Sequence, residues 1–292
     1  MHFVKAKGIL SSGFGMNIYR GCQHGCVYCD SRSRCYQFAH LFEDIEVKEN
    51  TLELLEAALK SKRKPCMLGT GSMSDPYMPA EAQLRMTRGM LELADKYGFG
   101  ATVLTKSDLV LRDLDVLQRI NRQSKAVVQI SLTMMDERLS NILEPNVCPT
   151  SRRIEVLRAL REAGIPTVVW LCPVLPFLTD TQENILAILE ACRDTGVKGI
   201  IQFGMGLTLR DGNREYFYAA LDRYFPGLKE RYIRIYGNAY ELPSPRNDAL
   251  MGLFHSFCQQ HGIWHDNDQI FSYLRTLEDE NYAQMSFFPG EA

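Results

Sequence analysis

Cys22-Gln-His-Gly-Cys26-Val-Tyr-Cys29 is the stretch of sequence from which the rest of the chain can be interpreted. It places three cysteines within eight residues. In a compartment that keeps thiols reduced, cysteines at such close spacing indicate a metal site rather than disulfides. A structural metal site closes its coordination with four protein ligands, whereas a site that does chemistry keeps a position open. Three cysteines therefore predict a metal centre with one open position.

The same cysteines also fit a zinc knuckle, with His24 or Cys35 as the fourth ligand. The protein would then be a non-catalytic zinc- or Fe-S-binding module that acts through a partner on its C-terminal part. This alternative predicts a colourless protein with about one zinc ion per chain. The residues outside the motif have to decide between the two interpretations.

Length and composition restrict the class of protein. The 292 residues are 46% hydrophobic and 23% charged, which is typical of a globular protein and excludes a disordered chain. The formal net charge of -2 argues against a strongly basic footprint for nucleic acid. No apolar run approaches the roughly 18–20 residues that span a bilayer, and residues 1–7 lack a signal-peptide core. We therefore expect a cytoplasmic protein without a membrane partner.

Short apolar strands alternate with amphipathic helices along most of the chain. Strands are predicted at 16–20, 66–69, 101–105, 126–131, 167–172 and 199–203, and helices at 50–60, 82–97, 107–120, 151–163 and 180–194. The last of these helices would begin at a capping box, Asp180-Thr-Gln-Glu183. Alternation of this kind predicts an α/β fold, a parallel sheet covered by helices. Six strand–helix units fit either a partial barrel or a doubly wound sheet.

The spacing C-x3-C-x2-C, with Tyr28 directly before the last cysteine, resembles the signature of the radical S-adenosylmethionine (SAM) superfamily. The resemblance implies that Cys22, Cys26 and Cys29 hold three irons of a [4Fe-4S] cluster, and that SAM chelates the fourth. It implies a partial (β/α)6 barrel of TIM type. It also implies reductive cleavage of SAM to a 5′-deoxyadenosyl radical, with an electron donor such as flavodoxin or ferredoxin as partner.

Small and polar residues follow the predicted strands. In parallel α/β folds, functional side chains lie on the loops after the carboxyl ends of the strands. Together with the resemblance, this position makes the following residues candidates for binding SAM: Tyr28, Gly71, Ser72, Ser74, Lys106, Ser131 and Thr133. Each alone could be a solvated or backbone-bonded residue, but their placement on one rim favours a site. Cys66, Cys172 and Cys192 lie in apolar surroundings and are predicted as small core residues.

Four motifs between Tyr19 and Gly204 resemble the spore-photoproduct-lyase-like group of the superfamily, often called DNA-repair-photolyase-like. These motifs are Tyr19-Arg-Gly-Cys-Gln-His-Gly-Cys-Val-Tyr-Cys29, Ser74-Asp75-Pro-Tyr77, Leu104-Thr-Lys-Ser-Asp108 and Ser131-Leu-Thr133. In that group, residues matching Ser74, Lys106 and Ser131 lie around SAM.

Two positions depart from the lyase pattern. Ser72 stands where the lyase has a hydrogen-donating cysteine, and Asp30 stands where it has a tyrosine. A hydroxyl hydrogen is too strongly bonded to replace a thiol hydrogen in that step. We therefore do not expect repair of spore photoproduct, and the substrate is a nucleic acid, a peptide or a small molecule. The weak net charge argues slightly against long duplexes, where phosphate contacts dominate affinity.

The predicted organisation has two parts. Residues 1–205 form the partial barrel with the cluster loop at 22–29, and residues 206–292 form a mixed C-terminal extension that caps the open side of the barrel. The extension contains predicted helices near 214–224 and 247–261, and a tail that ends in Met285-Ser-Phe-Phe288.

Overall fold

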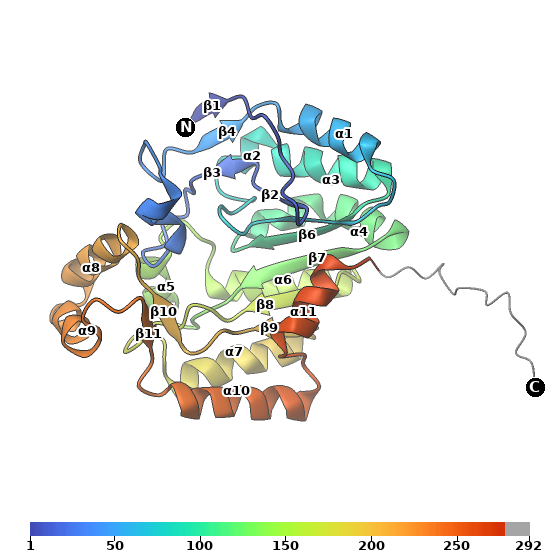
Figure 1. Ribbon diagram of the computed structural model, residues 1–292. Helices are drawn as coiled ribbons and strands as arrows, with labels where there is room; N and C mark the ends of the chain where they lie inside the picture. Colours follow the sequence, from blue (N-terminus) through green and yellow to red (C-terminus); the bar gives the residue numbers. More distant parts are fainter. Residues whose placement is uncertain (278–292) are drawn as a thin grey trace, which may run out of the picture.

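A six-stranded parallel sheet forms the centre of the computed structural model, which describes residues 1–277 (Figure 1). Its strands are β2 (Gly15–Met16), β5 (Met67–Thr70), β6 (Gly100–Thr105), β7 (Ala126–Ser131), β8 (Thr167–Trp170) and β9 (Gly199–Ile201). They lie side by side in the order in which they occur along the chain. A doubly wound sheet would reverse its order at a switch point. The sequential order therefore confirms the partial TIM-type barrel.

Helices cover the outer face of this sheet, one after each of the first five strands. They are α1 (Thr51–Ser61), α3 (Met86–Tyr97), α4 (Leu114–Gln123), α6 (Thr150–Glu162) and α7 (Gln182–Thr195). Alternate strand residues face opposite sides. Val103 and Val128 pack with the buried faces of these helices in the main hydrophobic core, whereas Val127 and Val168 belong to a separate cluster on the inner face.

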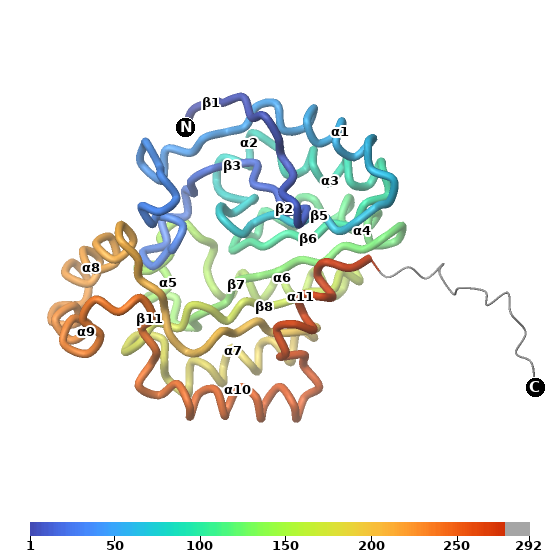
Figure 2. Tube along the Cα trace, in the orientation of Figure 1, coloured from blue at the N-terminus to red at the C-terminus, as the bar shows by residue number. Residues whose placement is uncertain are grey.

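The inner face of the sheet is filled by a helix from the C-terminal part of the chain. Ile270 and Leu274 of α11 (Asn267–Arg275) pack against the inward side chains of the sheet. Helix α10 (Asn247–His261) lies beside α7, so the chain returns along the outer layer before α11 (Figure 2). Among the helices of residues 1–277, none combines the length and apolar character that crossing a membrane requires.

The segment between β9 and α10 packs directly on the cysteine loop. It holds a two-stranded antiparallel ribbon, β10 (Gly206–Thr208) and β11 (Glu241–Pro243), with α8 (Asn213–Tyr224) and α9 (Leu228–Tyr236). These elements share one hydrophobic cluster with Val27, Tyr28 and other residues of the first 205. The predicted boundary at 205/206 coincides with the start of β10. The predicted tail ending in Met285-Ser-Phe-Phe288 lies outside the described residues.

A small second sheet precedes the barrel. It consists of β1 (His2–Val4), β4 (Glu46–Lys48) and β3 (Tyr19–Arg20) in that order. The single strand predicted at 16–20 is therefore wrong. Its first part, β2, pairs with β5 of the barrel, and its second part, β3, pairs antiparallel with β4, so the chain changes sheets between Met16 and Tyr19.

Three predicted helix boundaries also differ from the structure. The helix predicted at 82–97 breaks at Arg85, whose φ of 53° separates α2 (Glu81–Leu84) from α3. The break occurs because the buried Glu81 carboxylate accepts a hydrogen bond from the Thr87 backbone N–H in the first turn of α3. The one predicted at 107–120 begins as a 3-10 turn at Asp108–Asp113. The capping box is shifted by one residue.

Thr181, not Asp180, caps α7 by accepting from the Asn184 backbone N–H. The Asp180 carboxylate instead accepts from the Phe177 backbone N–H and the Ser244 hydroxyl. A long-range partner in the C-terminal part of the chain thus takes the carboxylate that the local pattern assigned to the helix.

Candidate active site

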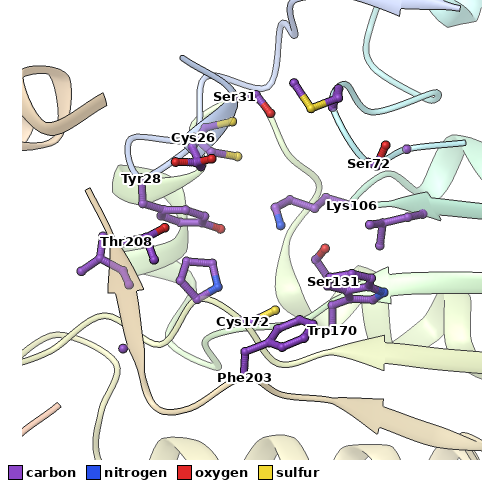
Figure 3. A pocket seen from close by; sticks show the side chains of 18 of the residues that line it. Cys26, Tyr28, Ser31, Ser72, Lys106, Ser131, Trp170, Cys172, Phe203 and Thr208 are labelled. Atoms are coloured by element: carbon purple, nitrogen blue, oxygen red, sulfur yellow. The ribbon is translucent and has the colours of Figure 1, made fainter. Parts of the chain in front are cut away.

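A cavity of about 820 Å³ opens at the carboxyl ends of the barrel strands, between the cysteine loop and the β10–β11 ribbon (Figure 3). All three predicted metal ligands line it: Cys22, Cys26 and Cys29. So do six of the seven residues predicted to contact SAM: Tyr28, Gly71, Ser72, Ser74, Lys106 and Ser131. The seventh, Thr133, is fully buried and is not part of the cavity wall. One chamber therefore unites segments that are far apart in sequence.

The cysteine loop is held by its backbone and by a glycine at its start. Cys22 donates its N–H to the Phe42 carbonyl at 3.0 Å, and Val27 donates to the Leu143 carbonyl at 2.9 Å. Gly21 has φ +88°, and a Cβ there would lie 2.4 Å from the Phe42 carbonyl oxygen. Only glycine fits such a position. The loop is thus pinned on both sides while its thiols face the cavity.

The three thiols suit a cluster better than a single ion. Zinc bound to thiolates at about 2.3 Å brings sulfurs to roughly 3.8 Å from one another. Within residues 1–277, the sulfurs of Cys22, Cys26 and Cys29 do not gather within 4.8 Å of one another. Burial raises the pKa of Cys22 to about 12, and burial also raises the pKa of Cys26 and Cys29. The thiolate forms therefore need the positive charge of bound metal.

Neither candidate for a fourth zinc ligand points to the cysteines. The His24 imidazole is buried with Nε2 3.0 Å from the Asp75 carboxylate and Nδ1 2.9 Å from the Asn146 carbonyl oxygen. Cys35 is exposed, and its sulfur accepts from Arg210 at 3.7 Å. The donor set of three thiols with one open position fits an iron–sulfur cluster that an exogenous ligand completes.

Asp75 connects three segments around the cavity. Besides contacting His24, its carboxylate accepts from the Thr105 hydroxyl at 2.6 Å and from the Lys106 backbone N–H at 2.7 Å. Burial raises the pKa of Asp75, but His24 and these donors outweigh it and lower the pKa overall. The Ser74-Asp75-Pro-Tyr77 motif is therefore explained by a carboxylate that joins the cysteine loop to the loops after β5 and β6.

A second buried carboxylate, Glu144, organises the wall beside Tyr28. It accepts from the Tyr28 hydroxyl, lies 2.6 Å from Arg153 Nη2 and lies 3.6 Å from Lys106 Nζ. Burial raises the pKa of Glu144, but Arg153 and Lys106 lower it to about 2. Arg153 also donates to the Ser131 carbonyl at 3.0 Å. Sequence reasoning missed Glu144 and Arg153, because nothing in their neighbourhoods distinguishes them from solvated charges.

The candidate residues on the opposite wall divide into two kinds. The Ser74 hydroxyl donates to the Tyr19 carbonyl at 2.8 Å. Gly71 has φ +106°, and a Cβ there would lie 2.2 Å from the Leu104 carbonyl oxygen, so packing against β6 already explains this glycine. The hydroxyls of Ser72 and Ser131 make no side-chain hydrogen bond within residues 1–277 and remain available toward the cavity (Figure 3).

The far side of the cavity is apolar and aromatic. Trp170 is held by donating its indole N–H to Gln129 at 2.7 Å, and Phe203 stands 62% exposed with its ring 6.0 Å from that of Trp170. The sequence predicts Cys172 as a core residue, but it lines this side, and burial raises the pKa of its thiol to about 12. The cavity thus contains a protonated thiol although Ser72 replaces the expected cysteine. Cys192 is fully buried, as predicted.

Comparison with protein-family models shows the family. The family model of the radical SAM superfamily matches residues 16–189. An uncharacterized protein of Mycobacterium tuberculosis is 30% identical over 250 residues, covering 81% of this chain and 71% of its own length. An uncharacterized protein of Acidianus two-tailed virus is 30% identical over 226 residues, covering 73% of each chain.

Solved structures of spore photoproduct lyase share the fold. One point mutant has a TM-score of 0.64 at 14% identity, covering 90% of this chain and 80% of its own. Another mutant, with bound AdoMet and dinucleoside spore photoproduct, has a TM-score of 0.63 at 13% identity and the same coverage. The segment that the family model matches includes every cysteine of the loop, the strands β5 to β8 and the polar residues of the cavity's cluster side. The chain therefore belongs to the radical SAM superfamily.

Proposed function

We propose that this protein binds a [4Fe-4S] cluster and SAM in the cavity and uses them on a substrate held in the same chamber. When bound, the cluster and SAM together supply a 5′-deoxyadenosyl radical that abstracts a hydrogen atom from the substrate. The observation that carries the proposal is one cavity lined by three thiols and by the hydroxyls of Ser72 and Ser131, which make no side-chain hydrogen bond within residues 1–277. A one-electron donor of the flavodoxin or ferredoxin type is the partner that it requires.

The cluster side of the cavity offers the groups that SAM needs. Lys106 Nζ lies at the wall with 14% of its side chain exposed and is suited to a carboxylate. The hydroxyls of Ser72 and Ser131 are suited to the ribose or the amino-acid end. Tyr28, Gly71 and Ser74 shape this wall, since their polar groups or backbone already have partners in the protein. Thr133 is fully buried and does not line the cavity, so it takes no part in the proposed SAM contacts.

The aromatic side of the cavity is where the substrate would lie. Trp170 and Phe203 offer ring faces, and the volume of about 820 Å³ falls within the range of pockets that enclose whole small molecules. A spore photoproduct lyase of this fold binds a dinucleoside, so a short nucleic acid is one substrate class to test. A gel-shift assay with single-stranded and duplex DNA at moderate salt separates it from peptide and small-molecule substrates.

Reductive cleavage of SAM tests the proposed function directly. The protein is reconstituted anaerobically with iron and sulfide, reduced with dithionite and given SAM, and 5′-deoxyadenosine is measured by chromatography. We expect product from the native chain and from the Cys35→Ala control, whose cysteine lies outside the cavity. Replacing Cys22, Cys26 or Cys29 with alanine should abolish it. A colourless zinc protein that leaves SAM intact would instead support the binding-module alternative.

A further inference from the structure

Three metal-ligating side chains meet at the edge of the small N-terminal sheet, apart from the cavity. They are His2 of β1, His40 of the loop before β4, and Glu46 of β4, and their ligand atoms all lie within 4.8 Å of one another. Within residues 1–277 they form the one such group of His, Cys, Asp or Glu residues. All three side chains are partly accessible, at 41%, 15% and 16% exposure. We call them the His2–His40–Glu46 site.

Both imidazoles are oriented through their Nδ1 atoms. His40 Nδ1 lies 2.8 Å from the Leu41 carbonyl oxygen, and His2 Nδ1 lies 3.2 Å from the Asp44 carboxylate. Because these acceptors hold the Nδ1 proton, the Nε2 atom of each ring is left as the ligand. Metal-binding histidines commonly donate the other ring N–H to a carbonyl or carboxylate in this way. The two rings meet edge to face, with centroids 4.8 Å apart.

We propose that the His2–His40–Glu46 site binds a divalent transition-metal ion of the zinc class. Two neutral imidazoles and one carboxylate are a donor set that zinc accepts, with a water in the fourth position. Nitrogen and oxygen ligands of zinc stand roughly 3.4 Å apart. The three ligand atoms here lie within 4.8 Å of one another, and His40 Nε2 already lies 2.9 Å from Glu46 Oε1, so the side chains need to move only slightly. The partial exposure of all three leaves them free to do so.

The charges around the site are compatible with the ion. Without metal, His40 Nε2 lies 2.9 Å from Glu46 Oε1, and Arg20 Nη1 lies 3.1 Å from the same oxygen. The chain's amino group contacts Asp44 at 2.7 Å. The ion would replace the imidazolium proton on His40 and use the carboxylate of Glu46, while Arg20 and Asp44 remain as outer partners.

Metal binding at this site would stabilise the position of the segment that leads into the cysteine loop. Arg20 contacts Glu46 and also donates to the Tyr36 and Gln37 carbonyls, and Cys22 follows it by two residues. A bound ion would join β1, the loop around His40 and β4 into one unit behind that segment. The ion is structural in this inference, and its binding does not depend on the proposed SAM chemistry.

Zinc titration of the chain without an affinity tag tests the site. The chain is first stripped with a chelator, and zinc is then titrated against a chromophoric competitor. We expect the His40→Ala and His2→Gln variants to bind one zinc ion fewer per chain than the native protein, or to bind that ion at least tenfold more weakly. The matched control, His261→Ala, replaces an exposed residue at the end of α10 and should bind as the native chain does.

Cysteine-bound zinc is separated by repeating the titration in the Cys22→Ala/Cys26→Ala variant. This double variant should still bind the zinc ion that His40→Ala fails to bind, whether or not the native protein cleaves SAM. His2→Gln alters a half-exposed side chain, so we expect this variant to fold, which circular dichroism checks. If His40→Ala unfolds, the zinc binding of His2→Gln alone decides the test. Equal zinc binding by the native, His2→Gln and His40→Ala proteins would overturn the proposal. The His2–His40–Glu46 site would then be an ion-pair network only.

Discussion

Glu144 is the residue on which the polar wall of the cavity most depends. Its fully buried carboxylate accepts a hydrogen bond from the Tyr28 hydroxyl and lies close to both Arg153 and Lys106. Two buried or half-buried cations share this one anion at close range. Removing the anion therefore leaves uncompensated charge inside the protein, which costs more than losing a surface pair.

The Glu144→Gln variant should lose about 3 kcal/mol of unfolding free energy at neutral pH, because Arg153 then lies buried without a counter-charge. Urea denaturation measures this loss. The folded-state pKa of about 2 lies below the usual value of about 4.3, so the stabilisation is present above pH ~4.5 and disappears as the pH falls toward 2. The matched control, Glu155→Gln, removes an exposed partner of Arg152 and should change stability by less than about 0.5 kcal/mol. Equal effects in the two variants would contradict the role of Glu144.

Gly71 illustrates a residue whose type is set by packing. Its φ of +106° and the 2.2 Å separation that a Cβ would have from the Leu104 carbonyl oxygen forbid a side chain. Gly71→Ala should destabilise the protein by about 2–4 kcal/mol, from backbone strain and overpacking together. Gly164→Ala shares a positive φ of +74° but meets nothing within 4 Å, so it should cost about 1 kcal/mol. Urea denaturation of both variants checks the difference, and equal losses would mean that strain alone operates.

At the scale of elements, α11 covers the part of the barrel interior that additional strands would enclose in a closed barrel. Six strands leave the inner face open on one side, and Ile270 and Leu274 fill it against the inward residues of the sheet. Gly199 has no side chain at the contact, where a Cβ would lie 2.9 Å from Ile270 Cδ1. The helix thus forms part of the barrel core, although it is remote in sequence.

Ile270→Ala should lower the unfolding free energy by about 2–4 kcal/mol, because it removes fully buried methyl groups and leaves a cavity against Gly199. Thermal or urea unfolding monitored by circular dichroism measures the loss. The neighbouring Gln269→Ala changes an exposed side chain of the same helix and should stay within about 0.5 kcal/mol of the native chain. A neutral Ile270→Ala would mean that α11 is not part of the core.

Local patterns predicted most elements but not their interruptions. The apolar stripes of α1, α6, α7 and α10 are visible in sequence because each helix buries one face. The break at Arg85 and the shifted cap at Thr181 were not predictable in this way. Each depends on a carboxylate, Glu81 or Asp180, that serves a partner beyond its own helix.

For the whole molecule, the count of strand–helix units was predictable, whereas the order of the strands was not. Hydrophobic periodicity indicates which residues are buried, but which strands pair with each other depends on contacts between distant parts of the sequence. The cysteine loop and the rim positions of Lys106 and Ser131 followed from the motif and from the rule that sites lie at strand ends. Their contacts with SAM remain a prediction. Glu144 and Arg153 joined the site only through the folding of distant segments.

Electron paramagnetic resonance of the reconstituted, reduced protein tests most directly whether the cysteine loop holds a cluster with an open position for SAM. We predict the signal of a reduced [4Fe-4S] cluster in the native chain, a change of that signal when SAM is added, and the same behaviour in Cys35→Ala. Cys26→Ala should lose the signal. A native protein that gives no cluster signal, or one that SAM leaves unchanged, would contradict the assignment of the cavity to cluster and SAM.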